Sequence, residues 1–365
     1  MKQRKSSRQR RRQMQMGRMI AVVVLVLLLG GVGYGAYIVY KASSTVGDAN
    51  QTLSRGGKSA LRDSEVNPLK DHISVLIMGV DESEKRKEVQ GEAVQADALL
   101  LATFNQDDKT VKLVSIPRDT YTYIPLTKKM DKINHAHSAG QAKNGKDGGP
   151  NVLIDAVEGL LHVPVDFFVK FNFAAFMEIV DEIGGIEVDV PTDITEQNSS
   201  DQEGAIRLKK GVQTLNGEEA LAFARTRHMD SDAMRGQRQQ LVVEAIIKKV
   251  ASVGSVTKIE GLIDAMDGNF KTNLTFNELI SFYKYGMSAS IEKLQIAGQD
   301  AYINSKKEAI ETNQKKRKGY TYYYLPDKKS LDETTRTLLK HLGKDEKYKH
   351  RYPQNNEVIK VMPEK

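Results

Sequence analysis

The feature that most constrains this chain is an uncharged apolar run from Ile20 to Tyr40, 21 residues without a proline. At about 1.5 Å per helical residue, a run of this length spans the roughly 30 Å hydrocarbon core of a bilayer. The preceding residues Met1–Met19 carry eight Lys and Arg side chains and no acid, whereas only Lys41 directly follows the run. The positive-inside bias therefore predicts a single-pass type II protein of the cell membrane, with a cytoplasmic tail and the bulk of the chain extracellular.

A cleaved signal peptide is the alternative interpretation, because such peptides also place an apolar region after a basic one. The run is longer than the apolar region of most signal peptides, and no clear Ala-x-Ala site ends it, so an uncleaved anchor is favoured. The chain has no cysteine, which excludes disulfides and thiolate metal sites and is compatible with a Gram-positive cell surface. Because the basic residues of the tail exceed the net charge of +7, the remainder is slightly acidic and the high pI does not indicate nucleic-acid binding.

Composition divides the rest of the chain. Residues 41–70 are rich in Ser, Gly, Lys and Asn and have no sustained periodicity, which predicts an extracellular stalk. Residues 71–253 hold the strongest apolar patterns and are predicted to form the main domain. Residues 254–342 are predicted to pack on this domain or to extend it, and 343–365 to form a polar tail.

Alternating strand and helix patterns predict a layered α/β/α fold with a central mixed sheet. His72–Val80 is a nearly continuous apolar run, which is typical of a strand buried on both faces. Further strands are predicted at 98–105, 111–116, 166–171, 186–190, 291–297 and 320–325. Helices are predicted at 150–161, 173–183, 217–225, 232–250, 258–266, 275–287 and 330–342. The segment from Asp119 to Gly149 is polar and ends in glycines.

Charged residues stand at the ends of the first predicted strands. Asp81 follows the first strand, Asp97 opens the second, and Pro117-Arg118-Asp119 terminates the third. In open α/β sheets, ligands bind in the crevice outside strand ends. We therefore expect one arginine and three carboxylates to meet at one edge of the sheet.

The segment 224–240 contains four arginines and two aspartates around a predicted loop between two helices. The backbone N–H groups of a helix start attract anions, and arginine offers bidentate donors to phosphate oxygens, so the segment predicts a diphosphate site. Asp232 fits the N-cap of the second helix, and three later residues share one face of it. The candidate site consists of Arg225, Arg227, Asp232, Arg235, Arg238 and Gln239. The alternative is a solvated helix face with surface ion pairs.

Other features point less directly to function. Large apolar side chains are dense between Phe167 and Val180; most are expected in the core, and a slot for a lipid chain is the alternative. His135 and His137 lack further ligands at zinc spacing, so a loop role is favoured, and His228 either orients phosphate or is structural. No Gly-x-Ser-x-Gly or Walker A motif is present, which argues against the commonest hydrolases and nucleotide triphosphatases.

Nine motifs between Asp71 and Val250 together resemble the LytR-CpsA-Psr family, membrane-anchored enzymes that attach glycopolymers to Gram-positive peptidoglycan. Each motif is common on its own, and the resemblance rests on their order over about half the chain. They are GVD at 79–81, Asp97, SIPRD at 115–119, KINxA at 132–136, VDFFVKF at 165–171, IGGIEVDV at 183–190, LNGEEAL at 215–221, ARTR at 224–227 and DxxRxxRQ at 232–239.

The resemblance implies that residues 71–253 form a catalytic domain whose sheet and helices enclose a polyprenyl chain, with the diphosphate at the mouth. It implies Mg²⁺-assisted transfer of a glycopolymer, wall teichoic acid or a related anionic glycan, from polyprenyl diphosphate to a peptidoglycan hydroxyl, with release of polyprenyl phosphate. No nucleic acid is expected as a partner. In the polyprenyl slot we expect the apolar faces of 150–161 and 173–183 and the strand 166–171.

Site roles carry over by position. Asp81 and Asp97 become metal ligands, either of which could also accept the proton of the acceptor hydroxyl, and Arg118 becomes a catalytic phosphate-binding residue. The phosphates are then held by Arg225, Arg227 and Arg238, with Asp232, Arg235 and Gln239 in support. One position departs from the family pattern, because Gln95 stands where the family usually has an arginine two residues before the second aspartate.

Two other functions use the same features. A tethered module could bind lipid-linked glycan or influence transcription without chemistry, and a diphosphate hydrolase would use water as the acceptor. The carboxylates favour an enzyme over a pure anion binder, since acids repel an anionic ligand unless a cation bridges them. The sequence separates neither transfer from hydrolysis nor one glycopolymer from another.

Overall fold

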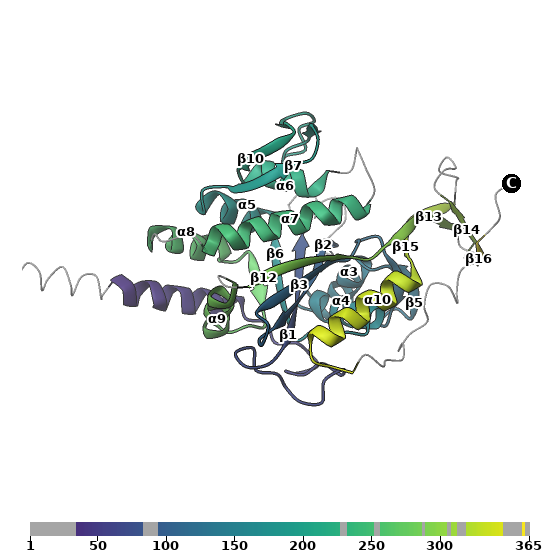
Figure 1. The fold of residues 1–365 in the computed structure, drawn as a ribbon, viewed down its shortest axis with the longest axis horizontal. Helices are drawn as coiled ribbons and strands as arrows, with labels where there is room; N and C mark the ends of the chain where they lie inside the picture. The colour runs from purple at the N-terminus through teal and green to yellow at the C-terminus, as the bar shows by residue number, and fades with distance from the viewer. Residues whose placement is uncertain are drawn as a thin grey trace, which may run out of the picture.

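The computed structural model describes residues 34–82, 94–226, 232–251, 256–286, 289–304, 308–311, 319–345 and 360–361. Its centre is a six-stranded mixed sheet with helices on both faces, which confirms the predicted α/β class (Figure 1). In spatial order the strands are β11 (Phe270–Thr272), β6 (Phe167–Asn172), β1 (Ile73–Val80), β2 (Ala96–Asn105), β3 (Thr110–Ser115) and β12 (Ser290–Gln295). β1 pairs in parallel with β6 and antiparallel with β2.

The helices divide between the two faces of this sheet (Figure 1). One face is covered by α3 (His135–Asn144), α4 (Gly148–Leu161) and α10 (Lys328–His341). On the other side lie α5 (Phe173–Glu182), α6 (Gly217–Arg225), α7 (Asp232–Ala251), α8 (Val256–Met266) and α9 (Phe276–Gly286).

The first strand is buried on both faces, as its sequence predicts. Leu76 and Met78 belong to the core shared with α4 and α10. Ile77, between them, packs into the core shared with α7 and α9. Successive side chains of a strand point to opposite faces, so a strand covered on both sides has to be apolar at nearly every position.

A small group of strands, which we call the crest (residues 186–215), lies beyond α5 and α6 at the top of Figure 1. It contains β7 (Ile186–Val190) paired with β10 (Gly211–Leu215), and β8 (Ile194–Glu196) paired with β9 (Ile206–Leu208). Its buried side chains form one core with α5, α6 and α7, so the crest is fixed to the helices.

The chain beyond residue 253 is part of the same sheet. β11 and β12 are its outermost strands, and α10 contributes Leu338 and Leu339 to the main core. Residues 254–342 therefore extend the predicted main domain. A second sheet holds β13 (Gly298–Asn304), β14 (Glu308–Glu311), β15 (Tyr320–Pro326) and β16 (Lys360–Val361). Most of the predicted polar tail lies outside the described residues.

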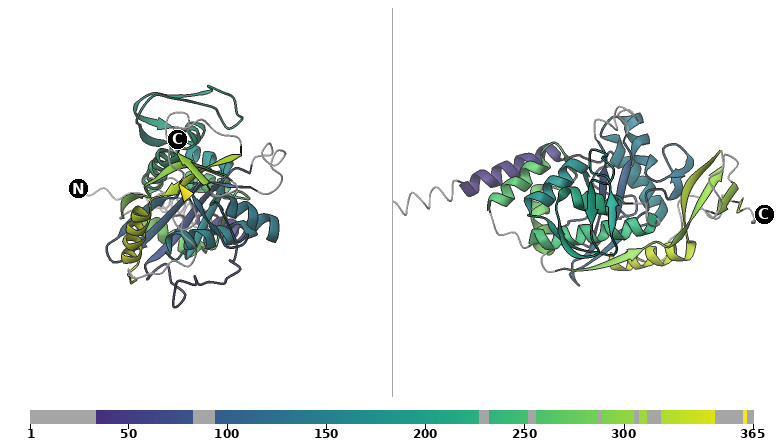
Figure 2. Two further views of the ribbon diagram at one scale, coloured as in Figure 1. Left: turned by 90° about the vertical axis from the view of Figure 1, so that its right-hand side faces the viewer. Right: turned by 90° about the horizontal axis from the view of Figure 1, so that it is seen from above.

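The predicted stalk differs from the structure. Residues 34–49 form a helix, and this helix packs against α8 through Ile38 and Ala42, beside which Figure 2 also places it. Further along, Arg55 pairs with Glu158 at 2.8 Å, and Arg62 pairs at 2.6 Å with Asp166, which directly precedes β6. After the helix, the segment is held by these ion pairs and by Leu53, which is buried in the main core, so it has too few apolar side chains to show a periodic pattern.

Residues 20–33 of the apolar run predicted to cross a membrane lie outside the described residues. Its last seven residues, 34–40, differ from the prediction: they begin the helix that packs on α8, where the hydroxyl of Tyr34 donates to Oε2 of Glu260. Within the described part, no helix has both the length and the apolar character that a bilayer crossing requires.

The polar segment after Asp119 contains elements that the sequence analysis did not assign. They are the hairpin of β4 (Tyr121–Ile124) and β5 (Lys129–Lys132), followed by α3. The strands of the hairpin are only four residues long. α3 packs on α4 through glycines: a Cβ at Gly140 would lie 2.3 Å from the carbonyl oxygen of Gly148. Because α3 contacts α4 through backbone atoms, the sequence of α3 carries no apolar stripe that would predict a helix.

Candidate active site

A cavity of about 240 Å³ lies between the central sheet and the helices α5, α6 and α7. Its apolar lining is Gly79, Ala98, Leu100, Phe171, Phe173, Phe176, Leu221, Ala224, Val242 and Val243. Its polar lining is Asp97, Arg118, Glu196, Gln197, Arg225, Arg235 and Gln239. Along β2 and along α7 the polar residues come first and the apolar ones follow, so the cavity has a polar end and an apolar end.

The apolar end is built partly as predicted. β6 and α5 supply Phe171 and Phe176, whose ring centroids lie 6.3 Å apart in a stacked arrangement. The sequence analysis also expected the apolar face of the helix 150–161 to line this cavity, and this prediction is wrong. α4 covers the opposite face of the sheet, and Val157 is fully buried in the core there. An apolar stripe shows that a helix packs on a sheet, but it does not show on which face.

Arg118 lies at the polar end, directly after β3, where paired charges hold it. One of its terminal nitrogens forms an ion pair with Asp97, and its Nε lies 3.7 Å from Oδ2 of Asp119. The other oxygen of Asp119 is 2.9 Å from Nζ of Lys132. We call this alternating series, Asp97, Arg118, Asp119 and Lys132, the charge ladder. It confines the Arg118 guanidinium at the cavity wall, with the side chain 17% exposed.

Asp81 and Asp97 come from adjacent ends of β1 and β2. Val80 pairs with Ala96, and the register is irregular between Gly79 and Val80, which places Asp97 beside the end of β1. Asp97 lines the cavity, whereas Asp81 is buried and is not among the lining residues. Within the described ranges, no group of three or more His, Cys, Asp or Glu side chains could hold a metal ion. Two carboxylates nevertheless fit Mg²⁺, which proteins commonly bind through one or two carboxylates together with substrate phosphates.

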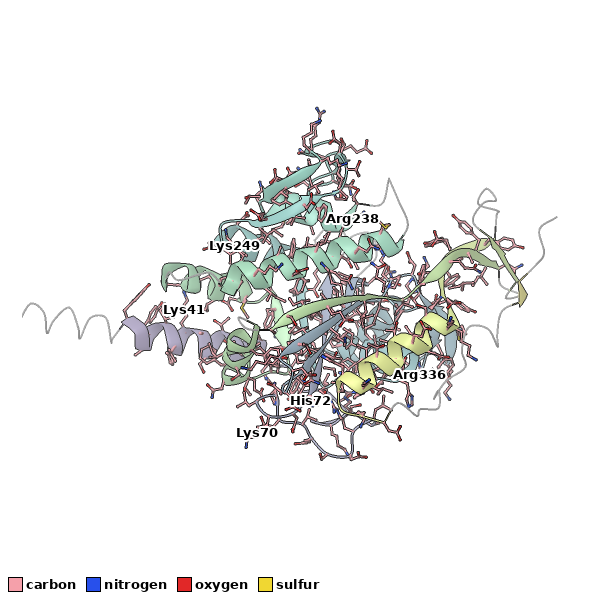
Figure 3. All side chains as sticks on the ribbon, viewed as in Figure 1. Lys41, Lys70, His72, Arg238, Lys249 and Arg336 are labelled. Carbon is pink, nitrogen blue, oxygen red and sulfur yellow. The ribbon has the colours of Figure 1, made fainter. Side chains whose placement is uncertain are left out.

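The predicted diphosphate site is only partly brought together. The guanidinium carbon of Arg225, at the end of α6, lies 5.1 Å from the ring centroid of Phe173. Arg235 and Gln239 line the cavity from α7. Arg238, labelled on α7 in Figure 3, instead donates from Nη2 to the carbonyl oxygen of Thr226 at 2.6 Å. This hydrogen bond joins α7 to the end of α6. α7 begins at Asp232, but its side chain, Arg227 and His228 lie outside the described part.

Several lining or supporting residues were missed from the sequence. Glu196 and Gln197 reach the cavity from the crest, and no motif or spacing marks them. Gly236 lets α7 cross close to β3, because a Cβ there would lie 2.4 Å from Oγ of Ser115. A lone glycine in a predicted helix is a signal for such a close approach.

Gln95, the departure from the family pattern, is not among the cavity-lining residues. Its side-chain oxygen accepts a hydrogen bond of 3.2 Å from Nδ2 of Asn134, which precedes α3. His135 and His137 lie in α3 rather than in a loop. Nδ1 of His135 is 2.9 Å from Oδ2 of Asp131. His137 donates from Nδ1 to the carbonyl oxygen of Val94 at 2.7 Å, and burial lowers its pKa to about 4.

The sequence matches known proteins over most of its length. Residues 36–340 match the LytR_cpsA_psr family. The polyisoprenyl-teichoic acid–peptidoglycan teichoic acid transferase TagT of Bacillus subtilis (strain 168) is 39% identical over 285 residues, which cover 78% of this chain and 85% of that protein.

Two solved structures extend the comparison to the fold. The structure of TagT bound to LIIa-WTA aligns with a TM-score of 0.64 at 36% identity, covering 80% of this chain and 99% of that chain. The LytR-CPS2A-psr family protein YwtF (TagT) with bound octaprenyl pyrophosphate lipid aligns with a TM-score of 0.60 at 34% identity, covering 80% and 99%. The named relative confirms the predicted enzyme class, a transferase. On the evidence of sequence and fold, the chain belongs to the LytR_cpsA_psr family.

Proposed function

We propose that this protein transfers a glycopolymer of the wall teichoic acid type from a polyprenyl diphosphate carrier to a hydroxyl group of peptidoglycan. The observation that carries the proposal is the cavity, which joins an apolar chamber to a cluster of guanidinium and carboxylate groups. A prenyl diphosphate has the same division into an apolar tail and an anionic head. The names of the relatives and the octaprenyl pyrophosphate bound to one of them support the same substrate class.

The two ends of the cavity have separate roles in binding. Phe171, Phe173 and Phe176 bury part of the prenyl chain, and burial of each CH₂ group contributes about 0.8 kcal/mol. Arg118, Arg225 and Arg235 bind the diphosphate oxygens, since arginine forms paired hydrogen bonds to phosphate. The guanidinium of Arg225 lies over the ring of Phe173, and its N–H groups would bind the anion.

The reaction is a phosphoryl-group transfer. The oxygen of the acceptor hydroxyl forms a bond to the phosphorus that carries the glycopolymer, the bond from that phosphorus to the bridging oxygen breaks, and polyprenyl phosphate leaves. Arg118 stabilises the charge that moves onto the leaving phosphate. Asp81 and Asp97 would hold Mg²⁺, which neutralises diphosphate charge when bound. Asp97, which lines the cavity, would take the proton of the acceptor hydroxyl.

The apolar run Ile20–Tyr40 and its basic flank support a location as a single-pass type II protein with the domain outside the cell membrane. Protease added to intact protoplasts should remove the chain beyond Lys41. Protection of the domain would contradict both this location and the function.

The function is tested with the full-length protein in nanodiscs, a synthetic polyprenyl diphosphate-linked glycan labelled in the sugar, and uncrosslinked peptidoglycan strands. We expect the label to appear in peptidoglycan, with one polyprenyl phosphate released for each glycan transferred. Chelation of divalent cations should stop the reaction, and Asp97→Asn should slow it at least a hundredfold or so, as loss of a transition-state contact does. Asp193→Asn, at an exposed position of the crest, is the matched control.

Each failure of this assay has a distinct meaning. Polyprenyl phosphate released equally well without peptidoglycan would identify a hydrolase. Binding of the donor without release would identify a tethered binding module. Full activity in chelator would remove Mg²⁺ from the proposal and leave the arginines as the charge-neutralising groups.

A further inference from the structure

Five residues on one face of the second sheet have no role in the chemistry above. Side chains alternate between the faces of a strand, so this face of β13 and β15 carries the buried Tyr324 and, beyond it, the partly exposed Asp300, Tyr302, Asn304, Tyr320 and Tyr322. We call these five partly exposed residues the tyrosine face. Tyr302 and Tyr322 lie directly opposite each other, with ring centroids 5.8 Å apart in an edge-to-face arrangement.

The opposite face of the same strands is buried, which fixes the sheet in place. Ala301, Ile303 and Leu325 form a small core there with Tyr121 of β4. The rings of the tyrosine face stay partly exposed. They are therefore held on a packed sheet and remain accessible from one side.

Polar groups surround these rings. The hydroxyl of Tyr322 donates to Oδ1 of Asp300 at 2.8 Å. Nδ2 of Asn304 donates to the hydroxyl of Tyr320 at 3.2 Å. Flat aromatic faces that pack on C–H groups, next to carboxylate, amide and hydroxyl groups that bond to hydroxyls, suit a sugar ring.

The tyrosine face is connected to the active site. β15 runs beside the segment that follows Arg118, and the backbone N–H of Tyr324 donates to the carbonyl oxygen of Asp119 at 2.9 Å. Nζ of Lys132, the last member of the charge ladder, lies 5.6 Å from the ring centroid of Tyr322. Figure 1 shows the same arrangement, with β15 leading from beside β5 out to the tip formed by β13, β14 and β16.

We propose that the tyrosine face binds the amino-sugar strand of the acceptor and directs one of its hydroxyls toward Arg118. The proposal rests on the proposed transferase function. Charge favours the acceptor over the donor's polymer: Asp300 lies on the face itself, and it repels a chain of phosphodiesters but not uncharged sugar rings. Among the residues that the structure describes, the cation that lies over a ring of the face is Lys132, and it is already paired with Asp119.

The test compares Tyr302→Ala with Tyr302→Phe in the full-length protein in nanodiscs. The phenylalanine variant keeps the ring, and no hydrogen bond of the Tyr302 hydroxyl is found within the described part. Removal of the ring should raise the KM for peptidoglycan strands about fivefold to tenfold, the size of one lost aromatic contact. The KM for the lipid donor and kcat should stay unchanged, and Tyr302→Phe should behave as the unaltered protein does.

A second measurement is independent of transfer. A water-soluble oligomer of β-linked N-acetylglucosamine is titrated against the same proteins by calorimetry, after thermal melting has shown that they are folded. We expect binding to the unaltered protein and to Tyr302→Phe, and a loss of at least fivefold or so in Tyr302→Ala. Asp300→Ala serves as the second variant if Tyr302→Ala does not fold.

The outcomes separate this proposal from the function on which it rests. Unchanged acceptor KM and unchanged oligosaccharide affinity in a folded variant overturn it. A rise in the donor KM alone would assign the face to the donor's glycan and also overturn it. Oligosaccharide binding that depends on Tyr302, in a protein without transferase activity, would keep the sugar site and reject the function.

Discussion

Arg118 reaches its place through charges that the protein itself supplies. The charge ladder fixes a long, flexible side chain before any substrate binds, so the entropy of ordering it is lost during folding rather than at the moment of reaction. In the proposed function, the substrate diphosphate would meet a guanidinium that is already oriented. The charge ladder therefore fixes the direction of the N–H groups of Arg118 as well as the position of its charge.

Arg118→Ala should therefore reduce transfer by about a hundredfold or more, because it removes a donor that acts on charge developing in the transition state. Arg118→Lys should recover little of this loss, since an ammonium group cannot form the paired hydrogen bonds of a guanidinium. Arg336→Ala, at an exposed position of α10 (Figure 3), is the control. Initial rates at saturating donor measure the effect, and a variant that works at half the normal rate would place Arg118 outside the reaction.

His137 makes the folded state sensitive to acid. Burial, and then the charge of Lys170, lowers its pKa from 6.5 to about 4 in the folded protein. The folded state therefore holds the neutral ring, while the unfolded chain binds a proton below about pH 6.5. The stability that this group contributes is complete above pH 6.5 and is lost as the pH falls toward 4.

We expect the free energy of unfolding, measured with urea, to decrease between pH 6.5 and pH 4.5. His137→Gln should be less stable at pH 7 but should lose less over the same interval. Burial lowers the pKa of His341 to about 4 as well, so His341→Gln should flatten the curve in the same sense. Equal slopes in all three proteins would show that other groups govern the acid response.

Among the elements, α7 is the one whose position decides the shape of the site. It brings Arg235 and Gln239 to the polar end of the cavity and Val242 to the apolar end. The absence of a side chain at Gly236 lets the helix approach the end of β3, directly before the residues that lead into Arg118. The distance between Arg118 and Arg235 thus depends on Gly236, which is not itself a cavity-lining residue.

Gly236→Ala should cost about 1–3 kcal/mol, as overpacking of a filled contact does, and should lower transfer by moving α7 outward. Ser115→Gly on the same chain should restore part of both losses, because the side chain that the new methyl group meets is gone. Gly47→Ala, with no atom within 4 Å of the added carbon, is the control and should be neutral or slightly stabilising. A double-mutant cycle on unfolding free energies measures the coupling, and strictly additive effects would contradict the predicted contact.

At the scale of the whole molecule, local sequence patterns predicted where helices and strands lie in the chain better than which other elements they pack against. β1 was recognisable because both of its faces are covered, and α4 because of its apolar stripe. That α4 lies on the face away from the cavity depends on how the chain crosses the sheet, which its own residues do not encode. For the same reason the predicted boundary at residue 253 did not mark the edge of the sheet: β12 pairs with β3 across about half the chain.

The site was predictable where motifs carry charge. Asp97, Arg118, Arg235 and Gln239 were assigned from the sequence and do line one cavity. Glu196 was not assigned from the sequence, because nothing in the sequence distinguishes a glutamate in a short strand near the cavity from one in any other short strand. Only the folding of the crest over α6 brings it to the cavity.

The position of residues 50–62 leads to a prediction about the smallest stable fragment. Asp166, with its side chain 2% exposed, is paired with Arg62 at 2.6 Å, and its Oδ2 also accepts from the backbone N–H of Ser74 at 2.9 Å. Removal of the arginine leaves a buried carboxylate without its cation, which costs about 3–5 kcal/mol. A fragment that begins at residue 71 should consequently melt well below one that begins at residue 50.

The single substitution Arg62→Ala in the longer fragment should reproduce most of this difference. Lys58→Ala, at an exposed position of the same segment, should not. Melting temperatures followed by circular dichroism decide the matter. Equal melting temperatures of the two fragments would show that residues 50–70 do not stabilise the domain, as expected of a stalk.

The helix formed by residues 34–49 has a consequence for how the protein works on a surface. Its Tyr34 hydroxyl donates to Oε2 of Glu260 at 2.7 Å, and Nζ of Lys41 lies 2.6 Å from Oδ1 of Asp264, so it is braced against α8 at two points. With the membrane anchor that we propose, this helix would connect the domain to the anchor rigidly rather than flexibly. The mouth of the cavity would then be held at one height and one tilt above the bilayer. Polyprenyl carriers would reach it by diffusion in the plane of the membrane, and peptidoglycan would approach from the opposite side.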